Sequence, residues 1–356
     1  MYYALIMAGG KGTRLWPLSR EKKPKHALKL VDDRTMFQHT VERLSPLFSS
    51  EQVFVITAAE HVAVLAEQVE ELPRQNFIIE PEGRGTAPAI GLAALHLRRK
   101  DPDAVMAVLT ADHFITQREA FRKSLSIAQL AAQQGYLVTL GIKPTEPSTG
   151  FGYIQQADLI TEIEGQPIYR VARFTEKPCL EEAQRMFASS EYSWNSGMFI
   201  WRVDNILAEF KRQMPDFYEQ LMLVEQVLGT PEYDKILNQI WPEVNKETID
   251  YGIIEAAQNL AVIPVDIGWT DVGSWGNLYG LLRTDEQGNI HVGETINLDS
   301  HNTLVFGNKR LIATIGLEDI IIVDTEDALL VCARGHEQDV KTIVNRLKEQ
   351  KKDHLL

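Results

Sequence analysis

Short, continuous apolar runs alternate with longer amphipathic stretches in the first part of the chain. An apolar run without polar alternation is typical of a strand buried on both faces of a parallel sheet. Strands separated by helices of about ten or more residues predict an α/β fold with right-handed crossovers. The expected strands are 3–7, 52–57, 77–79, 104–109 and 136–140, and the expected helices are 60–72, 87–99 and 118–134.

The pattern changes near residue 288, where short apolar runs recur without helices between them. These runs begin about nine residues apart, at 311–313, 320–323 and 329–331. They predict a small all-β unit, closed by an amphipathic helix over about 337–351. We therefore expect two domains, 1–287 and 288–356, packed directly on each other because no Pro/Ser-rich linker separates them.

Composition narrows the functional classes. The chain has 356 residues and a formal net charge of −13, which argues against nucleic-acid binding because phosphate contacts need a basic face. The two cysteines, Cys179 and Cys332, are far apart, so neither a metal-binding pair nor a disulfide framework is expected. No apolar window reaches the length of a membrane span. We therefore expect a cytoplasmic enzyme that binds neither nucleic acids nor membranes.

A glycine-rich loop, Gly9-Gly10-Lys11-Gly12-Thr13-Arg14, directly follows the first strand. Glycines let backbone N–H groups approach phosphate oxygens, and Lys11 and Arg14 add positive charge. The loop is no Walker motif, which needs Ser or Thr after Gly-Lys, and its spacing does not fit G-x-G-x-x-G. The glycines alone are equally compatible with a tight strand-to-helix turn, but Arg14 and the nearby Lys25 favour phosphate binding.

Residues 6–25, which contain this loop and Pro24-Lys25, resemble the signature of sugar-nucleotide pyrophosphorylases, the sugar-1-phosphate nucleotidyltransferases. The continuation 15–20 (LWPLSR) is similar to the mannose-1-phosphate guanylyltransferase branch in particular. The resemblance implies that Arg14 and Lys25 are catalytic residues that contact the triphosphate. It also implies a nucleotide-binding role for the neighbouring loop residues Ala8, Gly9, Gly10, Lys11, Gly12 and Thr13.

A second segment, from Glu80-Pro81 to Thr86-Ala87, lies between an expected strand and an expected helix. The start of a helix has free N–H donors, and the segment resembles the base- and ribose-binding part of the family. The resemblance implies that Glu80, Pro81, Thr86 and Ala87 bind the nucleotide. The family usually has Asn where this chain has Gly85, so hydrogen bonds of that amide must be replaced by backbone or water.

Two aspartates are the expected metal ligands. Asp112 follows the strand 104–109, and there a lone aspartate is a helix N-cap about as often as a metal ligand. Asp271 lies in the segment 269–275, which follows the family's order. The resemblance implies that Asp112 and Asp271 are catalytic and hold Mg²⁺, that Asp112 also binds the nucleotide, and that Asp271 also binds the sugar phosphate.

The remaining motifs of the chain resemble the sugar-binding segments of the family. A Gly-aromatic-Gly turn would let the sugar approach the backbone, a Glu-Lys pair would bind hydroxyls and phosphate, and an amide would lie beside the sugar. A further segment, 249–255, follows in the family's order without an assigned role. The residues implied in sugar-phosphate binding are Gly150, Phe151, Gly152, Glu176, Lys177, Asn195 and Gly197.

The resemblance implies transfer of a nucleotidyl group from GTP to mannose 1-phosphate, by Mg²⁺-assisted in-line attack that releases pyrophosphate. It implies a Rossmann-like, mixed and mainly parallel sheet, with a C-terminal unit resembling a left-handed β-helix and a homodimer as the expected assembly. The alternatives are the same chemistry with heptose or glucose 1-phosphate or another nucleotide, and a catalytically silent sensor. His26-Ala27 replaces the Gln-Phe usual in the branch, so we expect different loop packing there.

Overall fold

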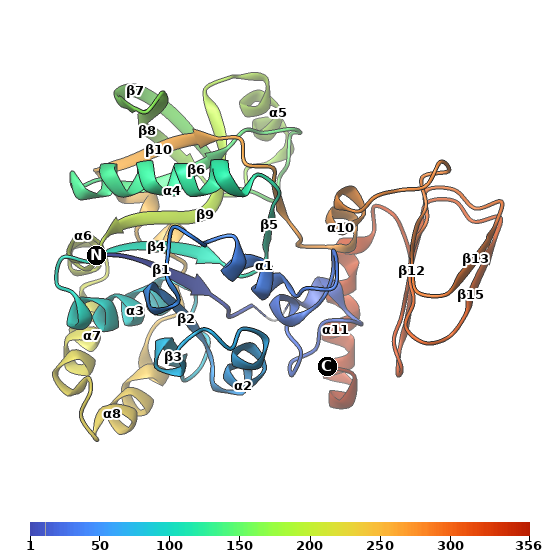
Figure 1. Cartoon of the computed structure of the whole chain (residues 1–356), viewed down its shortest axis with the longest axis horizontal. Coiled ribbons are helices and arrows are strands. Elements are labelled where there is room, and N and C mark those ends of the chain that lie inside the picture. The colour runs from blue at the N-terminus through green and yellow to red at the C-terminus, as the bar shows by residue number, and fades with distance from the viewer. Residues whose placement is uncertain (11) are drawn as a thin grey trace.

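Nine strands of the described chain form one mixed sheet in the larger part of the molecule (Figure 1). The computed structural model describes residues 1–10 and 12–356. The strand order is β3-β2-β1-β4-β9-β6-β10-β8-β7. The strands are β1 (Tyr2–Met7), β2 (Val53–Ala58), β3 (Phe77–Glu80), β4 (Val105–Thr110), β6 (Leu137–Ile142), β7 (Tyr153–Ile163), β8 (Gln166–Thr175), β9 (Tyr192–Arg202) and β10 (Leu260–Val265).

The predicted parallel arrangement is confirmed for β3, β2, β1 and β4, which lie side by side and run in one direction. β9 inserts antiparallel between β4 and β6, and β10 runs parallel to β6. β8 is antiparallel to both β10 and β7, so β8 and β9 oppose the other seven strands of the described sheet. The sheet is therefore mixed and mainly parallel, as expected.

Helices cover both faces of this sheet (Figure 1). The predicted helices are α2, α3 and α4, although α2 ends about four residues earlier than its apolar period suggested. The helices of the larger part are α1 (Met36–Glu42), α2 (Ala59–Gln68), α3 (Thr86–Lys100), α4 (Arg118–Gln133), α5 (Leu180–Ala188), α6 (Val203–Gln213), α7 (Pro215–Val227), α8 (Tyr233–Ile240), α9 (Ile249–Gly252) and α10 (Trp275–Leu281).

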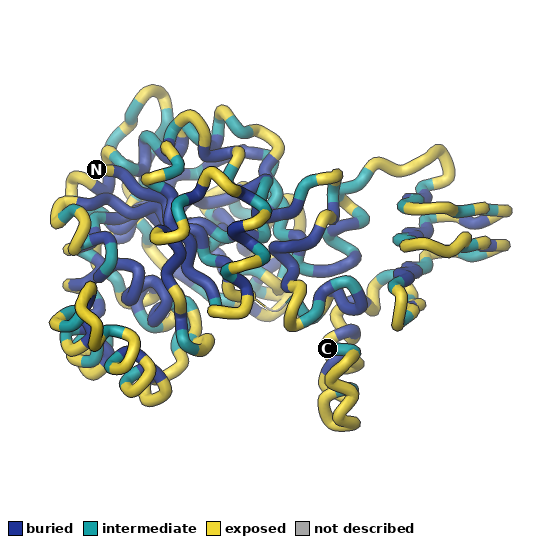
Figure 2. The backbone as a smooth tube through the Cα atoms, turned by 60° about the horizontal axis from the view of Figure 1, so that its bottom comes forward, coloured by how far each residue is buried: buried dark blue, intermediate teal, exposed yellow. Residues whose placement is uncertain are grey.

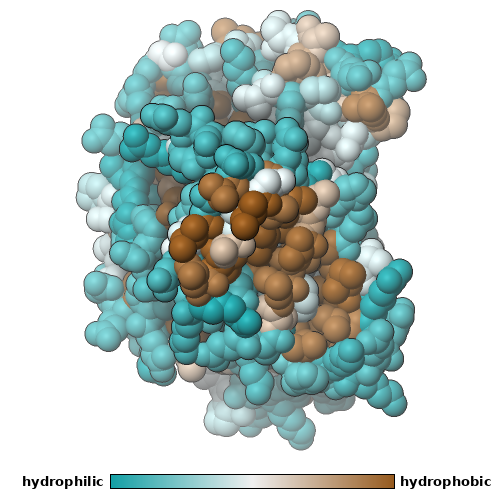
Figure 3. All heavy atoms as spheres, turned by 90° about the vertical axis from the view of Figure 1, so that its right-hand side faces the viewer, coloured by the Kyte–Doolittle hydropathy of each residue, from teal (hydrophilic) through white to brown (hydrophobic). Residues whose placement is uncertain are grey.

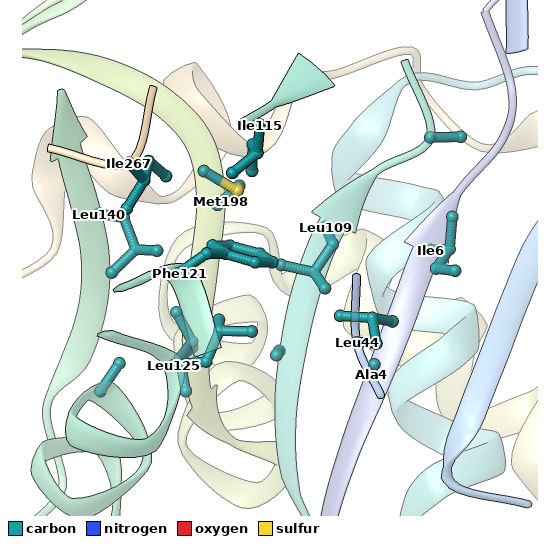
Figure 4. Close-up of a cluster of buried hydrophobic side chains, with 14 of the residues drawn as sticks. Ala4, Ile6, Leu44, Leu109, Ile115, Phe121, Leu125, Leu140, Met198 and Ile267 are labelled. Carbon is teal, nitrogen blue, oxygen red and sulfur yellow. The ribbon is translucent and has the colours of Figure 1, made fainter. Parts of the chain in front are cut away.

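β1 illustrates why its apolar run needs no polar alternation. Tyr2, Ala4 and Ile6 contribute to the core beneath α1, α2 and α4, whereas Tyr3 and Leu5 contribute to the core beneath α3, α6 and α7. A strand with a core on each face is buried throughout, and Figure 2 shows the central strands buried along their length. Figure 4 shows the first core, where Phe121 and Leu125 of α4 lie near Leu109 of β4 and Leu140 of β6.

The C-terminal unit is all-β, as predicted, and its strands stack in two parallel sets. One set is β12, β14 and β16, which β17 extends antiparallel, and the other is β13 and β15. The segments β12–β13 and β14–β15 each carry two short strands, and β17 turns back on β16, so successive apolar runs lie close together in the sequence. The elements are β12 (Ile290–Val292), β13 (Thr295–Leu298), β14 (Leu304–Phe306), β15 (Ile312–Ile315), β16 (Ile320–Asp324), β17 (Leu329–Ala333) and α11 (Val340–Glu349).

A third core joins the C-terminal unit to the segment that follows the glycine-rich loop. Leu15 and Trp16 pack there with Trp275 of α10 and Val344 of α11. The Trp275 indole Nε1 donates a hydrogen bond to the Trp16 carbonyl at 3.1 Å. The two parts therefore pack directly on each other, as expected for a chain without a Pro/Ser-rich linker between them. Among the described residues, no helix is both long and apolar enough to cross a membrane.

Candidate active site

Two adjoining cavities open at the carboxyl ends of the sheet strands, where α/β sheets commonly bind ligands. β1, β2 and β4 end near one level because Met7 pairs with both Ile56 and Thr110. The first cavity has a volume of about 340 Å³ and the second about 150 Å³. Three residues line both: Thr110, Gly197 and Asp250.

Lys25 lines neither cavity itself, but its ammonium links a carboxylate of the first cavity to a carboxylate of the second. Its Nζ donates to Asp112 Oδ2 at 2.7 Å and to Asp271 Oδ1 at 3.3 Å. Asp112 lines the first cavity and Asp271 lines the second. The lysine is 5% exposed, so its charge is held by these carboxylates rather than by water. The predicted catalytic residues Lys25, Asp112 and Asp271 therefore lie together, although 246 positions separate Lys25 from Asp271.

A short antiparallel pair of strands brings the two aspartates together. β5 (His113–Ile115) starts directly after Asp112, and β11 (Trp269–Asp271) ends in the second acid. Asp271 is the register partner of His113 in this pair. The Trp269 indole Nε1 donates to His113 Nδ1 at 3.1 Å, so the buried His113 orients this pair of strands.

The charges at this junction stabilise one another. Burial opposes the charged form of Lys25, but the charges of Asp112 and Asp271 outweigh it and raise the lysine pKa. Burial likewise opposes ionisation of Asp112, yet the Lys25 charge keeps the pKa of that carboxyl below its ordinary value. Burial lowers the pKa of Arg43 to about 9, and its guanidinium donates to the His113 carbonyl at 2.6 Å. Arg43 thus supports the backbone behind Asp112.

The glycine-rich loop borders the first cavity through Ala8, Gly9 and Gly10. A Cβ atom at Gly9 or Gly10 would meet no heavy atom within 4 Å, so the loop backbone faces open space. Gly12 packs instead on Lys25, where a Cβ would lie 2.4 Å from the lysine Cβ. Thr13 lines a separate crevice towards α11. Arg14 is exposed outside both cavities, and Lys11 lies outside the described residues.

The predicted base-binding segment is tied to α9. The Arg84 N–H donates to Glu80 Oε1 at 2.9 Å, and Thr86 Oγ1 accepts from the Ile249 N–H at 2.8 Å. Gly85 has a φ of 95°, and a Cβ there would lie 2.2 Å from the Glu247 carbonyl oxygen. This position therefore requires glycine in this chain, where the family usually has Asn. Two predicted residues do not line the cavity: Pro81, which is half-buried, and Ala87, which is fully buried.

The second cavity is lined by most of the predicted sugar-binding residues: Gly150, Phe151, Gly152, Glu176, Asn195, Gly197 and Asp271. A Cβ at Gly152 would lie 2.4 Å from Glu176 Oε2, so the carboxylate rests directly on that backbone. Glu176 Oε2 is buried and has no hydrogen-bond partner among the described residues. The Lys177 ammonium is exposed outside the cavity and pairs with Glu176 Oε1 at 2.8 Å.

The residues that line the two cavities without a site role predicted from the sequence include the titratable His26 and Asp250. His26 lies in the first, is 2% exposed, and stacks edge to face on His61 with ring centroids 5.7 Å apart. Burial lowers the pKa of His26 to about 4. Asp250 lines both cavities, and burial followed by the charge of Glu176 raises its pKa to about 6. The sequence contained a signal for each of these residues. His26 directly follows Lys25, and Asp250 lies in the family-like segment 249–255 that had no assigned role.

Comparison with known proteins gives matches over both parts of the chain. The nucleotidyl transferase family model matches residues 3–288, and the mannose-phosphate isomerase/GMP-like β-helix domain model matches 293–347. A mannose-1-phosphate guanylyltransferase from Klebsiella pneumoniae is 42% identical over 99% of this chain and 75% of its own. The Xanthomonas campestris xanthan biosynthesis protein XanB is 41% identical over 97% of this chain and 73% of its own.

A solved structure from Thermus thermophilus, described as a mannose-1-phosphate geranyltransferase, has a TM-score of 0.87. It is 32% identical in sequence and covers 98% of this chain and 99% of its own. The likeness therefore includes both the nine-stranded sheet and the C-terminal β unit. The β-helix family model also explains the two parallel strand sets of that unit.

Proposed function

The chain belongs to the mannose-1-phosphate guanylyltransferase family of nucleotidyltransferases, and we propose that it makes GDP-mannose and pyrophosphate from GTP and mannose 1-phosphate. The junction of the two cavities carries this proposal. Lys25, Asp112 and Asp271 meet between a larger cavity beside a glycine-rich loop and a smaller cavity lined by polar side chains. A nucleotide in the first cavity and a sugar phosphate in the second would bring their phosphates together there.

The reaction needs positioning and charge neutralisation rather than a covalent enzyme intermediate. An oxygen of the sugar phosphate attacks the α-phosphorus of GTP, the bond to the bridging oxygen breaks, and pyrophosphate leaves. Lys25 holds the α-phosphate, whereas Lys11 and Arg14 hold the departing pyrophosphate. Lys177 receives the incoming phosphate. Arg14 is exposed and no other described residue pairs with it, so its guanidinium is available for a ligand.

The wider set of residues follows the two cavities. The nucleotide is held by the loop Ala8–Thr13, by Glu80, Pro81, Thr86 and Ala87, and by Asp112. The sugar is held by the Gly150–Gly152 turn, Glu176, Asn195 and Gly197. Pro81 and Ala87 act by shaping the turn and the start of α3, because neither lines the cavity. Glu80 lines the cavity and also holds the turn, because its carboxylate accepts the Arg84 N–H.

Asp112 and Asp271 are the proposed Mg²⁺ ligands. The described residues contain no group of three or more His, Cys, Asp or Glu that could hold a metal alone. Mg²⁺ is commonly held by one or two carboxylates, with substrate phosphates and water completing its shell, so a pair of acids fits. The two carboxylates outnumber the ammonium of Lys25, which leaves negative charge for a cation. When bound, the ion neutralises charge on the phosphate oxygens.

Pyrophosphate release tests this function. Purified protein is assayed with Mg²⁺, four nucleoside triphosphates, and mannose, glucose and heptose 1-phosphates, with products identified by mass. GTP with mannose 1-phosphate should give the highest turnover, and EDTA should abolish it. Asp271→Asn should lower kcat by about 10²- to 10³-fold. Dominance of another pair would move the substrate assignment to that pair, and nucleotide binding without any turnover would favour a silent sensor.

We also propose that the active form is a cytoplasmic homodimer joined through the C-terminal β unit. Several large apolar side chains of this unit are exposed, and Figure 3 shows an apolar patch on this end of the molecule. Leu298 and Ile315 are register partners in β13 and β15, and both are more than half exposed. A flat apolar face suits a symmetric contact with a second copy.

Sedimentation velocity tests the assembly. The wild-type chain should sediment as a dimer, and Ile315→Asp should shift it to a monomer. Leu159→Asp changes a comparably exposed leucine in β7, outside the C-terminal unit, and should leave the dimer intact. A monomeric wild type at micromolar concentration would contradict the homodimer.

A further inference from the structure

We propose that Asp250 binds a hydroxyl of the sugar 1-phosphate and thereby helps determine which sugar the enzyme accepts. This inference rests on the proposed function, because it assigns a ligand group to a residue of the same site. Asp250 belongs to α9, and it is one of three residues that line both cavities.

The backbone around Asp250 is held firmly. The preceding residue, Ile249, donates its N–H to Thr86 Oγ1 at 2.8 Å. Two residues further back, the Glu247 carbonyl accepts the Ala87 N–H at 3.2 Å, and the Glu247 N–H donates to the Arg84 carbonyl at 3.0 Å. The start of α3 thus fixes the segment 247–249, so the Asp250 carboxylate is presented from a rigid position.

The neighbours of the Asp250 carboxylate belong to the second cavity. Asn195 Nδ2 donates to Asp250 Oδ1 at 2.8 Å, and Asn195 Oδ1 accepts the Gly197 N–H at 3.1 Å. Both polar ends of the amide are therefore occupied, and Asn195 is fixed with its NH₂ towards the acid. Apart from Asn195, only the Asp250 backbone N–H donates to this carboxylate among the described residues, so it keeps acceptor capacity for a ligand in the cavity.

The cavity offers acceptors without protein donors. Glu176 Oε2 and Thr110 Oγ1 are buried and have no hydrogen-bond partner among the described residues. A buried acceptor left unpaired is costly, and two nearby carboxylates repel each other. A ligand with several hydroxyl groups supplies the missing donors, because each hydroxyl can donate to one acid and thereby stabilise its charged form. The other two acids of the first cavity already have donors, since Glu80 accepts the Arg84 N–H and Asp112 accepts from the Lys25 ammonium, so this demand for donors lies on the sugar side.

Steady-state kinetics of Asp250→Asn tests the proposal. Asparagine has the same size, but it carries no charge and replaces one carboxylate oxygen with an NH₂ donor, so the sugar hydroxyl loses its charged acceptor. The KM for mannose 1-phosphate should rise about 10- to 100-fold, as expected for a lost charged hydrogen bond, while the KM for GTP stays nearly constant. Asp158→Asn is the matched control, because Asp158 is exposed in β7 and remote from both cavities. A change confined to the KM for GTP would overturn the proposal.

Deoxy sugar phosphates identify the partner hydroxyl without relying on one variant. The wild-type enzyme should lose a similar factor with one of the 2-, 3-, 4- or 6-deoxy mannose 1-phosphates, and Asp250→Asn should show no further loss with that analogue. Equal penalties of the variant on every analogue would overturn the proposal. If the wild type prefers another sugar 1-phosphate, the proposed substrate is wrong, and the same comparison with that sugar and its deoxy analogues decides the role of Asp250.

Discussion

The two cavities are linked through the ammonium of Lys25, but their walls differ. The first, of about 340 Å³, has a wall of loop backbone and small residues, such as Gly9, Gly10, Gly83 and Gly85. The second, of about 150 Å³, is lined by carboxylates and an amide on longer side chains. The first cavity therefore suits recognition through shape and backbone N–H groups, whereas the second suits recognition through directed side-chain hydrogen bonds.

This difference follows from how each cavity is built. The first lies beyond the parallel strands β1, β2 and β4, where glycine-containing turns let the backbone itself face a ligand. The second lies between antiparallel strands, where β9 contacts both β6 and β7 and contributes Asn195. In a strand, alternate side chains face one side, so a site built there is lined by side chains.

Lys25 contacts a carboxylate from each cavity, so its replacement should have the largest effect on turnover. Lys25→Met keeps the stem but removes the charge that faces Asp112 and Asp271. We expect kcat to fall by about 10²- to 10³-fold. Leaving two half-buried carboxylates without their partner should also lower the melting temperature at pH 7. Lys25→Arg should recover part of the thermal stability, and turnover near wild type in Lys25→Met would contradict the role of the lysine.

Gly85→Asn introduces the residue that the family resemblance led us to expect here, and it should damage the first cavity selectively. An asparagine there meets both the positive φ and the Glu247 carbonyl. We expect the free energy of unfolding to fall by about 2 to 4 kcal/mol in chemical denaturation. The KM for GTP should rise more than the KM for the sugar phosphate. Gly83→Ala is the control for stability, because a Cβ at Gly83 meets nothing within 4 Å.

Gly152→Ala should damage the second cavity in the same selective way. Its Cβ would displace the Glu176 carboxylate, which is 2.4 Å away, whereas the Cβ of Gly150→Ala would meet only Ser148 Oγ at 3.5 Å. We expect the KM for mannose 1-phosphate to rise about tenfold in Gly152→Ala and far less in Gly150→Ala. Equal effects of the two substitutions would show that the Glu176 position does not decide sugar binding.

His26→Gln should change the free energy of unfolding little at pH 7. It should, however, change how this free energy depends on pH. The pKa of His26 is about 4 in the folded chain and 6.5 ordinarily, so the unfolded chain binds the proton first as the pH falls. The stability that this neutral histidine contributes is complete above pH 6.5 and is lost towards pH 4. In urea titrations between pH 6.5 and pH 4, the free energy of unfolding of His26→Gln should therefore fall by up to about 3 kcal/mol less than that of the wild type.

His336→Gln serves as the control for that experiment, because His336 is exposed beside α11. Its unfolding free energy should follow the wild-type pH dependence. His96, a half-buried histidine whose pKa burial also lowers to about 4, is present in all three proteins, so it does not affect the difference. An unchanged pH dependence in His26→Gln would mean that His26 is protonated equally in the folded and unfolded chains.

The sequence alone determined the alternation of strands and helices, the all-β C-terminal unit and the glycine-rich loop, because these depend on local period and on turn residues. It also indicated Lys25, Asp112 and Asp271, since each lies in a short motif. The tertiary structure decided how these three meet, because pairing of β5 with β11 joins segments more than 150 positions apart. It also decided the strict need for glycine at position 85 and the place of Asp250 between two cavities. Both depend on contacts between residues 247–249 and the start of α3. These contacts join distant parts of the sequence, so no local pattern encodes them.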